Sequence, residues 1–144
     1  TWARTERWGF VVADPGTLPA GISARNALEA ISAYEESHGP RAALTSWEAF
    51  VKHHPTNAIG QFALGNALYA DQQIDEASNA FERATALDKE MGAAWLNLGL
   101  VLLQQRAPSA AHEALKNAAA LEGDWQAKAR EHLSKLAVSS AASQ

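Results

Sequence analysis

The stretch GAAWLNLGLVLLQQRAPSAAHEALKNAAALEGDW, residues 92–125, decides the fold because its pattern recurs upstream at a fixed step. Gly65 precedes Gly99 by 34 residues, and Leu64 precedes Leu98 by the same step. Two longer series keep this step as well, namely Ala43, Ala77 and Ala111, and the bulky residues Trp47, Phe81 and Leu115. Agreement at several independent positions indicates an internal repeat of helical units.

The repeated residues resemble the tetratricopeptide repeat, which places an aromatic residue, Leu-Gly, further aromatics and alanines at fixed offsets. Three units fit, at 24–57, 58–91 and 92–125, and the last of them fits best. Gln61 stands where an aromatic residue is usual, and Ala30 and Ile31 replace Leu-Gly in the first unit. The resemblance implies an all-α fold, a right-handed superhelical solenoid of three helix-turn-helix repeats.

Glycine and alanine have a physical role in this pattern. Two antiparallel helices approach closely only where their side chains are small, so we expect Gly65 to face Ala77 and Gly99 to face Ala111. Pro40 and Pro108 occupy offsets in the first turn of a second helix, where proline is tolerated.

The repeat divides the chain into regions. We expect a strand-like segment and linker at 1–22, a repeat domain at 23–137, and a disordered tail of small polar residues at 138–144. Within the repeat domain, residues 124–137 carry apolar residues at helical spacing with charges between them. This pattern predicts a capping helix with a polar outer face, which a solenoid needs at its end.

The composition excludes several classes of function. The chain has 12 basic and 16 acidic residues, a net charge of −4, and no basic run that would bind nucleic acid. Cysteine is absent, so disulfides, thiol nucleophiles and cysteine zinc sites are excluded. No apolar run is long enough to span a bilayer.

Residues with catalytic potential do not form a recognisable constellation. The five histidines lack the spacing of metal ligands, and no phosphate loop or nucleophile elbow is present. We therefore expect no enzymatic activity, no cofactor and no metal site in this chain.

The resemblance implies a scaffold that binds a protein partner, because the first helices of such repeats line a concave groove for a peptide or helix. Carried over position by position, the groove consists of Leu28, Ile59, Phe62, Asn66, Tyr69, Leu96, Leu100 and Leu103. A buried Asn66 amide would be its polar anchor, since an amide pairs with both groups of an extended backbone. Two alternatives stay open: Asn66 is an ordinary solvated residue, or the C-terminal helix covers Leu96, Leu100 and Leu103.

The opening stretch WGFVVADPGTLPAG, residues 8–21, reads as a strand followed by a turn and linker. Residues 1–20 resemble the C-terminal end of bacterial papain-like peptidase domains of the double-glycine-leader type. That resemblance implies a non-catalytic module behind a peptidase domain in a bacterial envelope protein. As alternatives, the segment is disordered or folded back, or it mediates self-association by binding the groove of a neighbouring molecule.

Overall fold

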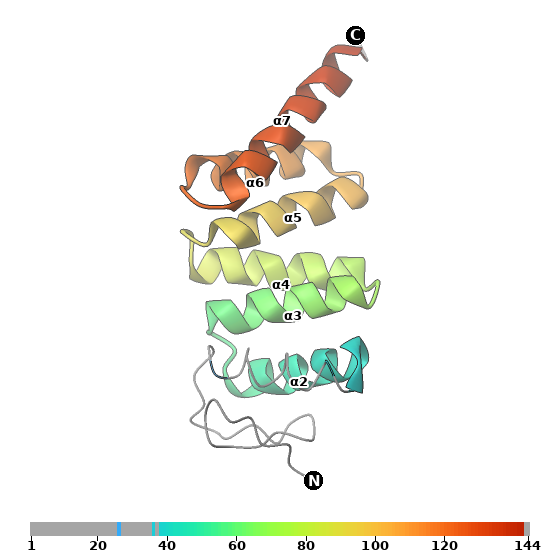
Figure 1. Ribbon diagram of the computed structural model, residues 1–144, viewed down its shortest axis with the longest axis vertical. Helices are drawn as coiled ribbons and strands as arrows, with labels where there is room; N and C mark the ends of the chain where they lie inside the picture. Colours follow the sequence, from blue (N-terminus) through green and yellow to red (C-terminus); the bar gives the residue numbers. More distant parts are fainter. Residues whose placement is uncertain (1–25, 27–35, 37, 143–144) are drawn as a thin grey trace. The chain divides into compact units, whose positions relative to one another are not determined.

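The computed structural model describes residues 26, 36 and 38–142 (Figure 1). The helices in this part are α2 (Pro40–His53), α3 (Ala58–Ala70), α4 (Ile74–Leu87), α5 (Gly92–Gln104), α6 (Pro108–Ala120) and α7 (Trp125–Ala142). No strand occurs among the described residues, and the predicted all-α class is confirmed. The predicted strand-like segment 1–22 and the groove residue Leu28 lie outside the described residues.

The helices begin at intervals that match the sequence repeat. The first helices α3 and α5 begin at Ala58 and Gly92, and the second helices α2, α4 and α6 begin at Pro40, Ile74 and Pro108. Both series advance by 34 residues. The two prolines stand in the first turns of α2 and α6, as predicted, where the missing N–H would have had no partner in the helix.

The turns that end α3 and α5 share a backbone feature. Gln72 and Arg106, which are 34 residues apart, have positive φ angles of 66° and 59°. In the first turn, the amides of Gln72 and Gln73 donate to the carbonyls of Tyr69 and Leu68 at 3.0 and 2.9 Å. The second turn repeats this arrangement at the equivalent residues. It is the Schellman ending of a helix, here with a long polar side chain in the left-handed position that usually holds glycine.

The chain forms two compact units, residues 1–80 and residues 81–144, so that α4 contributes to both. In the first unit α2 packs against α3. Phe50, which is buried, lies so close to Gly60 that a Cβ atom on the glycine would be 2.7 Å from the ring. Trp47 meets the Phe50 ring edge to face, with the centroids 5.5 Å apart. The aromatic side chains of α2 therefore require the glycine at the beginning of α3.

In the second unit, α5 packs closely against α6. A Cβ atom on Gly99 would be 2.7 Å from both Cγ and Cδ2 of Leu115 and 3.5 Å from the carbonyl oxygen of Ala111. Gly99 is thus the point of close approach, as predicted, although the nearest side chain is Leu115 rather than Ala111. Leu115 and Ala111 are both fully buried.

The beginning of α7 is fixed by Trp125. Its indole lies against two glycines, because Cβ atoms on Gly92 and Gly123 would be only 1.9 and 2.3 Å from ring atoms. The indole N–H donates to the carbonyl of Leu121 at 3.1 Å. From this anchor α7 packs on α6 and α5, as Figure 1 shows for the upper helices of the molecule.

The C-terminal helix is longer than the sequence indicated. We expected a helix over 124–137 and a disordered tail over 138–144, whereas α7 continues to Ala142. Residues 137–142 are alanine, valine and serine, with no glycine or proline to end the helix. Val138 is 69% exposed in this extension, so it is not packed against the repeats.

Candidate functional site

The helix α3 is apolar on more than one side. It contains no charged residue. Ile59 is 42% exposed and Tyr69 is 38% exposed, and Phe62, which lies between them in the sequence, is half-buried. Asn66 is exposed, whereas the sequence argument treated its amide as buried. An uncharged helix with exposed large apolar side chains is unusual on a protein surface and marks a candidate contact surface. We call Ile59, Phe62, Asn66 and Tyr69 the α3 surface.

The helix α5 is also uncharged, but its predicted groove residues have a different environment. Leu96 is only 8% exposed and forms a buried cluster with Leu115, Ala118 and Ala129, the last of which lies on α7. Leu100 and Leu103 are half-buried and pack against the same cluster, together with Leu133 and Leu136 of α7. This placement agrees with the alternative that the C-terminal helix covers these leucines.

A groove that the sequence analysis did not identify lies in the second unit, with a volume of about 610 Å³. We call it the Trp95 groove; it is lined by Glu82, Thr85, Ala86, Lys89, Trp95, Leu98, Asn117, Ala120 and Leu121. Of these residues, the sequence analysis named only Leu98, as a position that keeps the 34-residue step, and this gave no indication of a groove. Trp95 and Leu121 are in fact half-buried, so part of their apolar surface faces the groove.

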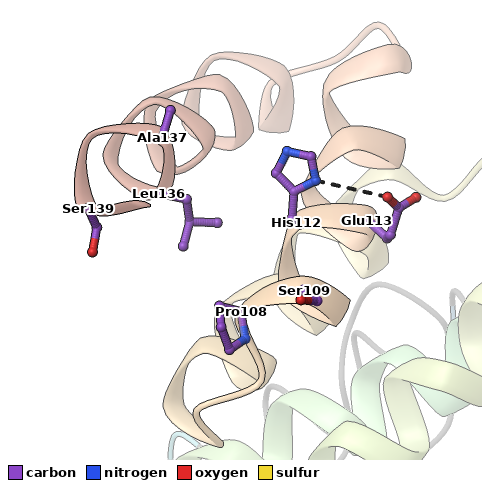
Figure 2. Close-up of a pocket in the computed structure, with 7 residues that line it drawn as sticks. All are labelled: Pro108, Ser109, His112, Glu113, Leu136, Ala137 and Ser139. Carbon is purple, nitrogen blue, oxygen red and sulfur yellow. Dashed lines mark ion pairs between the residues drawn. The ribbon is translucent and has the colours of Figure 1, made fainter. Parts of the chain in front are cut away.

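A second groove of about 680 Å³ separates the first turns of α6 from the last turns of α7. Figure 2 shows Pro108, Ser109, His112 and Glu113 on one side and Leu136, Ala137 and Ser139 on the other. Nδ1 of His112 lies 3.9 Å from Oε1 of Glu113, and Nζ of Lys116 lies 3.7 Å from the same carboxylate oxygen. All three side chains are at least half exposed, so this is a solvated cluster of weak ion pairs.

Asp71, directly after α3, is bonded to two other side chains of the first unit. Its carboxylate accepts hydrogen bonds from the amide of Gln73 and from the guanidinium of Arg41 at the beginning of α2. The hydrogen bond from Gln73, and after it the contact with Arg41, hold the pKa of Asp71 below its ordinary value. The bond from Arg41 connects residues 30 positions apart and so links the beginning of α2 to the residue after α3.

The described part of the chain has neither a metal-binding cluster nor a membrane-spanning helix. Residues 38–142 contain no group of three or more histidine, aspartate or glutamate side chains arranged to hold a metal ion. Among the helices described, none combines the length and the apolar character that crossing a bilayer requires.

Comparison with known proteins gives a consistent result. A family model described as tetratricopeptide repeat matches residues 28–77 and 62–128. The crystal structure of MamA is similar to this chain with a TM-score of 0.64 and 25% identity, over 81% of this chain and 73% of that one. The chaperone SycD of the Yersinia enterocolitica type III secretion translocator has a TM-score of 0.74 at 16% identity, over 83% and 88% of the two chains.

These similarities support the solenoid of helix pairs. No curated protein matches the chain. The family match begins at residue 28, and no comparison supports the resemblance of residues 1–20 to a peptidase domain.

Proposed function

This chain belongs to the tetratricopeptide repeat family, and on that premise we propose that it is a protein-interaction scaffold whose α3 surface binds a peptide or helix of its partner. Repeats of this kind stack helix pairs into extended surfaces that bind other proteins. One structure with the same fold, SycD, is named as a chaperone, which is a protein-binding role.

The observation that carries the proposal is the composition of α3. A helix without charges whose Ile59 and Tyr69 are both more than one third exposed leaves apolar area in water. Burying the apolar area that these side chains still expose contributes about 25 cal/mol per Å². The exposed Asn66 lies at helical spacing between Phe62 and Tyr69, so it belongs to the same surface.

The other first helix, α5, belongs to the second unit and is not assigned to the α3 surface. Of its predicted groove residues, Leu96 is buried in the cluster that includes Ala129 of α7, and Leu100 and Leu103 are half-buried. We therefore assign the main anchors to Ile59 and Tyr69, with Phe62 as the half-buried base of the surface.

The test is to select peptides against the full chain from a random library and to measure their affinity for variants. Tyr69→Ala and Ile59→Ser each remove an exposed anchor and should weaken the selected peptides at least tenfold, about 1.4 kcal/mol. Glu48→Ala on the exposed side of α2 is the matched control and should change the affinity less than threefold. Circular dichroism should show unchanged helix content in all three variants. Equal affinity for Tyr69→Ala and Glu48→Ala would disprove the assignment of the α3 surface.

A further inference from the structure

The Trp95 groove has an apolar lining with a fixed tryptophan. The indole N–H of Trp95 donates to the carbonyl of Lys89 at 2.9 Å, which holds the ring in place and satisfies its polar atom. Leu98 is buried beneath the groove. Ala86 and Ala120, which are exposed, have small side chains and leave the groove open. An occupant of this groove therefore meets apolar surface, and bulky apolar side chains fit it best.

The end of the groove at Lys89 and Leu121 is acidic. The α4–α5 turn and the α6–α7 turn lie at the same end of the helices of the second unit, at the left edge of Figure 1. These turns carry the exposed carboxylates of Asp88, Glu90, Glu122 and Asp124, and Lys89 is the basic residue among them. The formal charge at this edge is −3, from four acidic residues and one basic residue. A complementary occupant combines bulky apolar side chains with basic ones.

The chain itself contains such a segment. Residues 1–12, TWARTERWGFVV, hold three aromatic residues and two arginines with one glutamate. This segment lies outside the described residues, and neither the repeat pattern nor the α3 surface accounts for its composition. We propose that residues 1–12 of one molecule bind the Trp95 groove of a second copy of this chain. The aromatic side chains contact Trp95 and Leu121, and Arg4 and Arg7 lie near the acidic edge.

This arrangement has a geometric consequence. The groove and the segment are different surfaces, so one contact uses the segment of one molecule and the groove of the other, and it leaves the second segment and the first groove free. Binding of the free segment in the free groove closes an exchanged dimer, and binding of further molecules extends the assembly into rings or chains. The proposal is independent of the α3 surface, because neither the Trp95 groove nor residues 1–12 share a residue with that surface.

The test measures the mass of the full chain by light scattering on a sizing column. We expect the wild type to elute at twice its chain mass of 15.4 kDa or more, with the fraction of larger species rising with concentration. Ala86→Glu places a charged side chain in the groove from an exposed position and should return the chain to 15.4 kDa. Ala127→Glu, on an exposed position of α7 outside the groove, is the matched control and should keep the wild-type mass.

A charge exchange then identifies the occupant. Arg4→Glu with Arg7→Glu should abolish assembly, and adding Glu122→Lys with Asp124→Lys should restore it. A monomeric wild type would overturn the proposal. This holds also if residues 1–12 bind the groove of their own molecule, because such a chain is a monomer. Assembly that survives Ala86→Glu would exclude the groove, and assembly that survives the arginine substitutions would exclude the segment. The peptide-binding test of the α3 surface uses other variants, namely Ile59→Ser, Tyr69→Ala and Glu48→Ala. A negative result in the assembly test therefore leaves the proposed scaffold function unaffected.

Discussion

Replacing Gly99 with alanine tests the close approach of α5 and α6. The added Cβ atom would lie 2.7 Å from Cγ and Cδ2 of Leu115, whereas carbon atoms in good contact are about 3.5–4.0 Å apart. Leu115 has no exposed surface, so it cannot turn into solvent to avoid the methyl group. The helices must separate or the leucine must leave its preferred rotamer.

The magnitude follows from two opposing effects. Overpacking a buried contact costs about 1–3 kcal/mol. Alanine within a helix is favoured over glycine by about 1 kcal/mol, which offsets part of this loss. We expect Gly99→Ala to lower the free energy of unfolding by about 1 kcal/mol. Leu115→Ala alone should lower it by about 2–5 kcal/mol, because it leaves a cavity.

The double variant separates steric conflict from other effects. In Gly99→Ala with Leu115→Ala, the new methyl group occupies space that the leucine has vacated. The combined loss should be smaller than the sum of the single losses by about 1 kcal/mol or more. Equilibrium unfolding in urea, followed by circular dichroism, measures all four proteins with a common slope. A neutral or stabilising Gly99→Ala, or additive losses within about 0.5 kcal/mol, would refute the close approach.

Two further predictions concern the turns and Asp71. Gln72→Gly and Arg106→Gly should each stabilise the chain by roughly 0.5–1 kcal/mol, measured by thermal unfolding. Both residues have positive φ angles, which glycine adopts without strain. As a control, Ser134→Gly within α7 should destabilise the chain. Since the folded-state pKa of Asp71 is lowered, its contribution to stability is fully present above the ordinary aspartate pKa of about 3.9 and is lost as the pH falls through the folded-state value. The difference in melting temperature between wild type and Asp71→Asn should therefore shrink in acid, and a difference that does not vary with pH would contradict this role.

The sequence was sufficient to predict the helix pairs because the information is local and repeated. Glycine at 99 and alanine at 111 allow two helices to pack closely, and proline at 108 favours the beginning of a helix. Glycine and alanine return one period earlier, and proline returns two periods earlier. Gln61 shows that one departure from the pattern is tolerated. It is 2% exposed, and its amide donates to the carbonyl of Pro55 at 2.9 Å, so a polar side chain replaces the usual aromatic residue without an unsatisfied group.

The candidate surfaces could be predicted only in part. Ile59 and Tyr69 are exposed, which their positions on a first helix allowed us to expect. The burial of Leu96 depends on where α7 packs, and spacing along α5 contains no information on that. The Trp95 groove likewise depends on how far the ends of α4 and α6 diverge, a distance that no pattern within one helix specifies.

The contact between Trp125 and Gly92 restricts how this gene can lose a repeat. The residue equivalent to Gly92 one period earlier is Ala58, and a Cβ atom at position 92 would be 1.9 Å from the indole nitrogen. Deleting residues 58–91 removes one period and keeps Gly92 next to Trp125. Deleting residues 91–124 also removes one period, but it places Trp125 after a repeat that begins with Ala58. Two deletions of equal length thus differ in outcome. A shortened array would keep the packing of Trp125 on a glycine after deletion of residues 58–91, but not after deletion of residues 91–124.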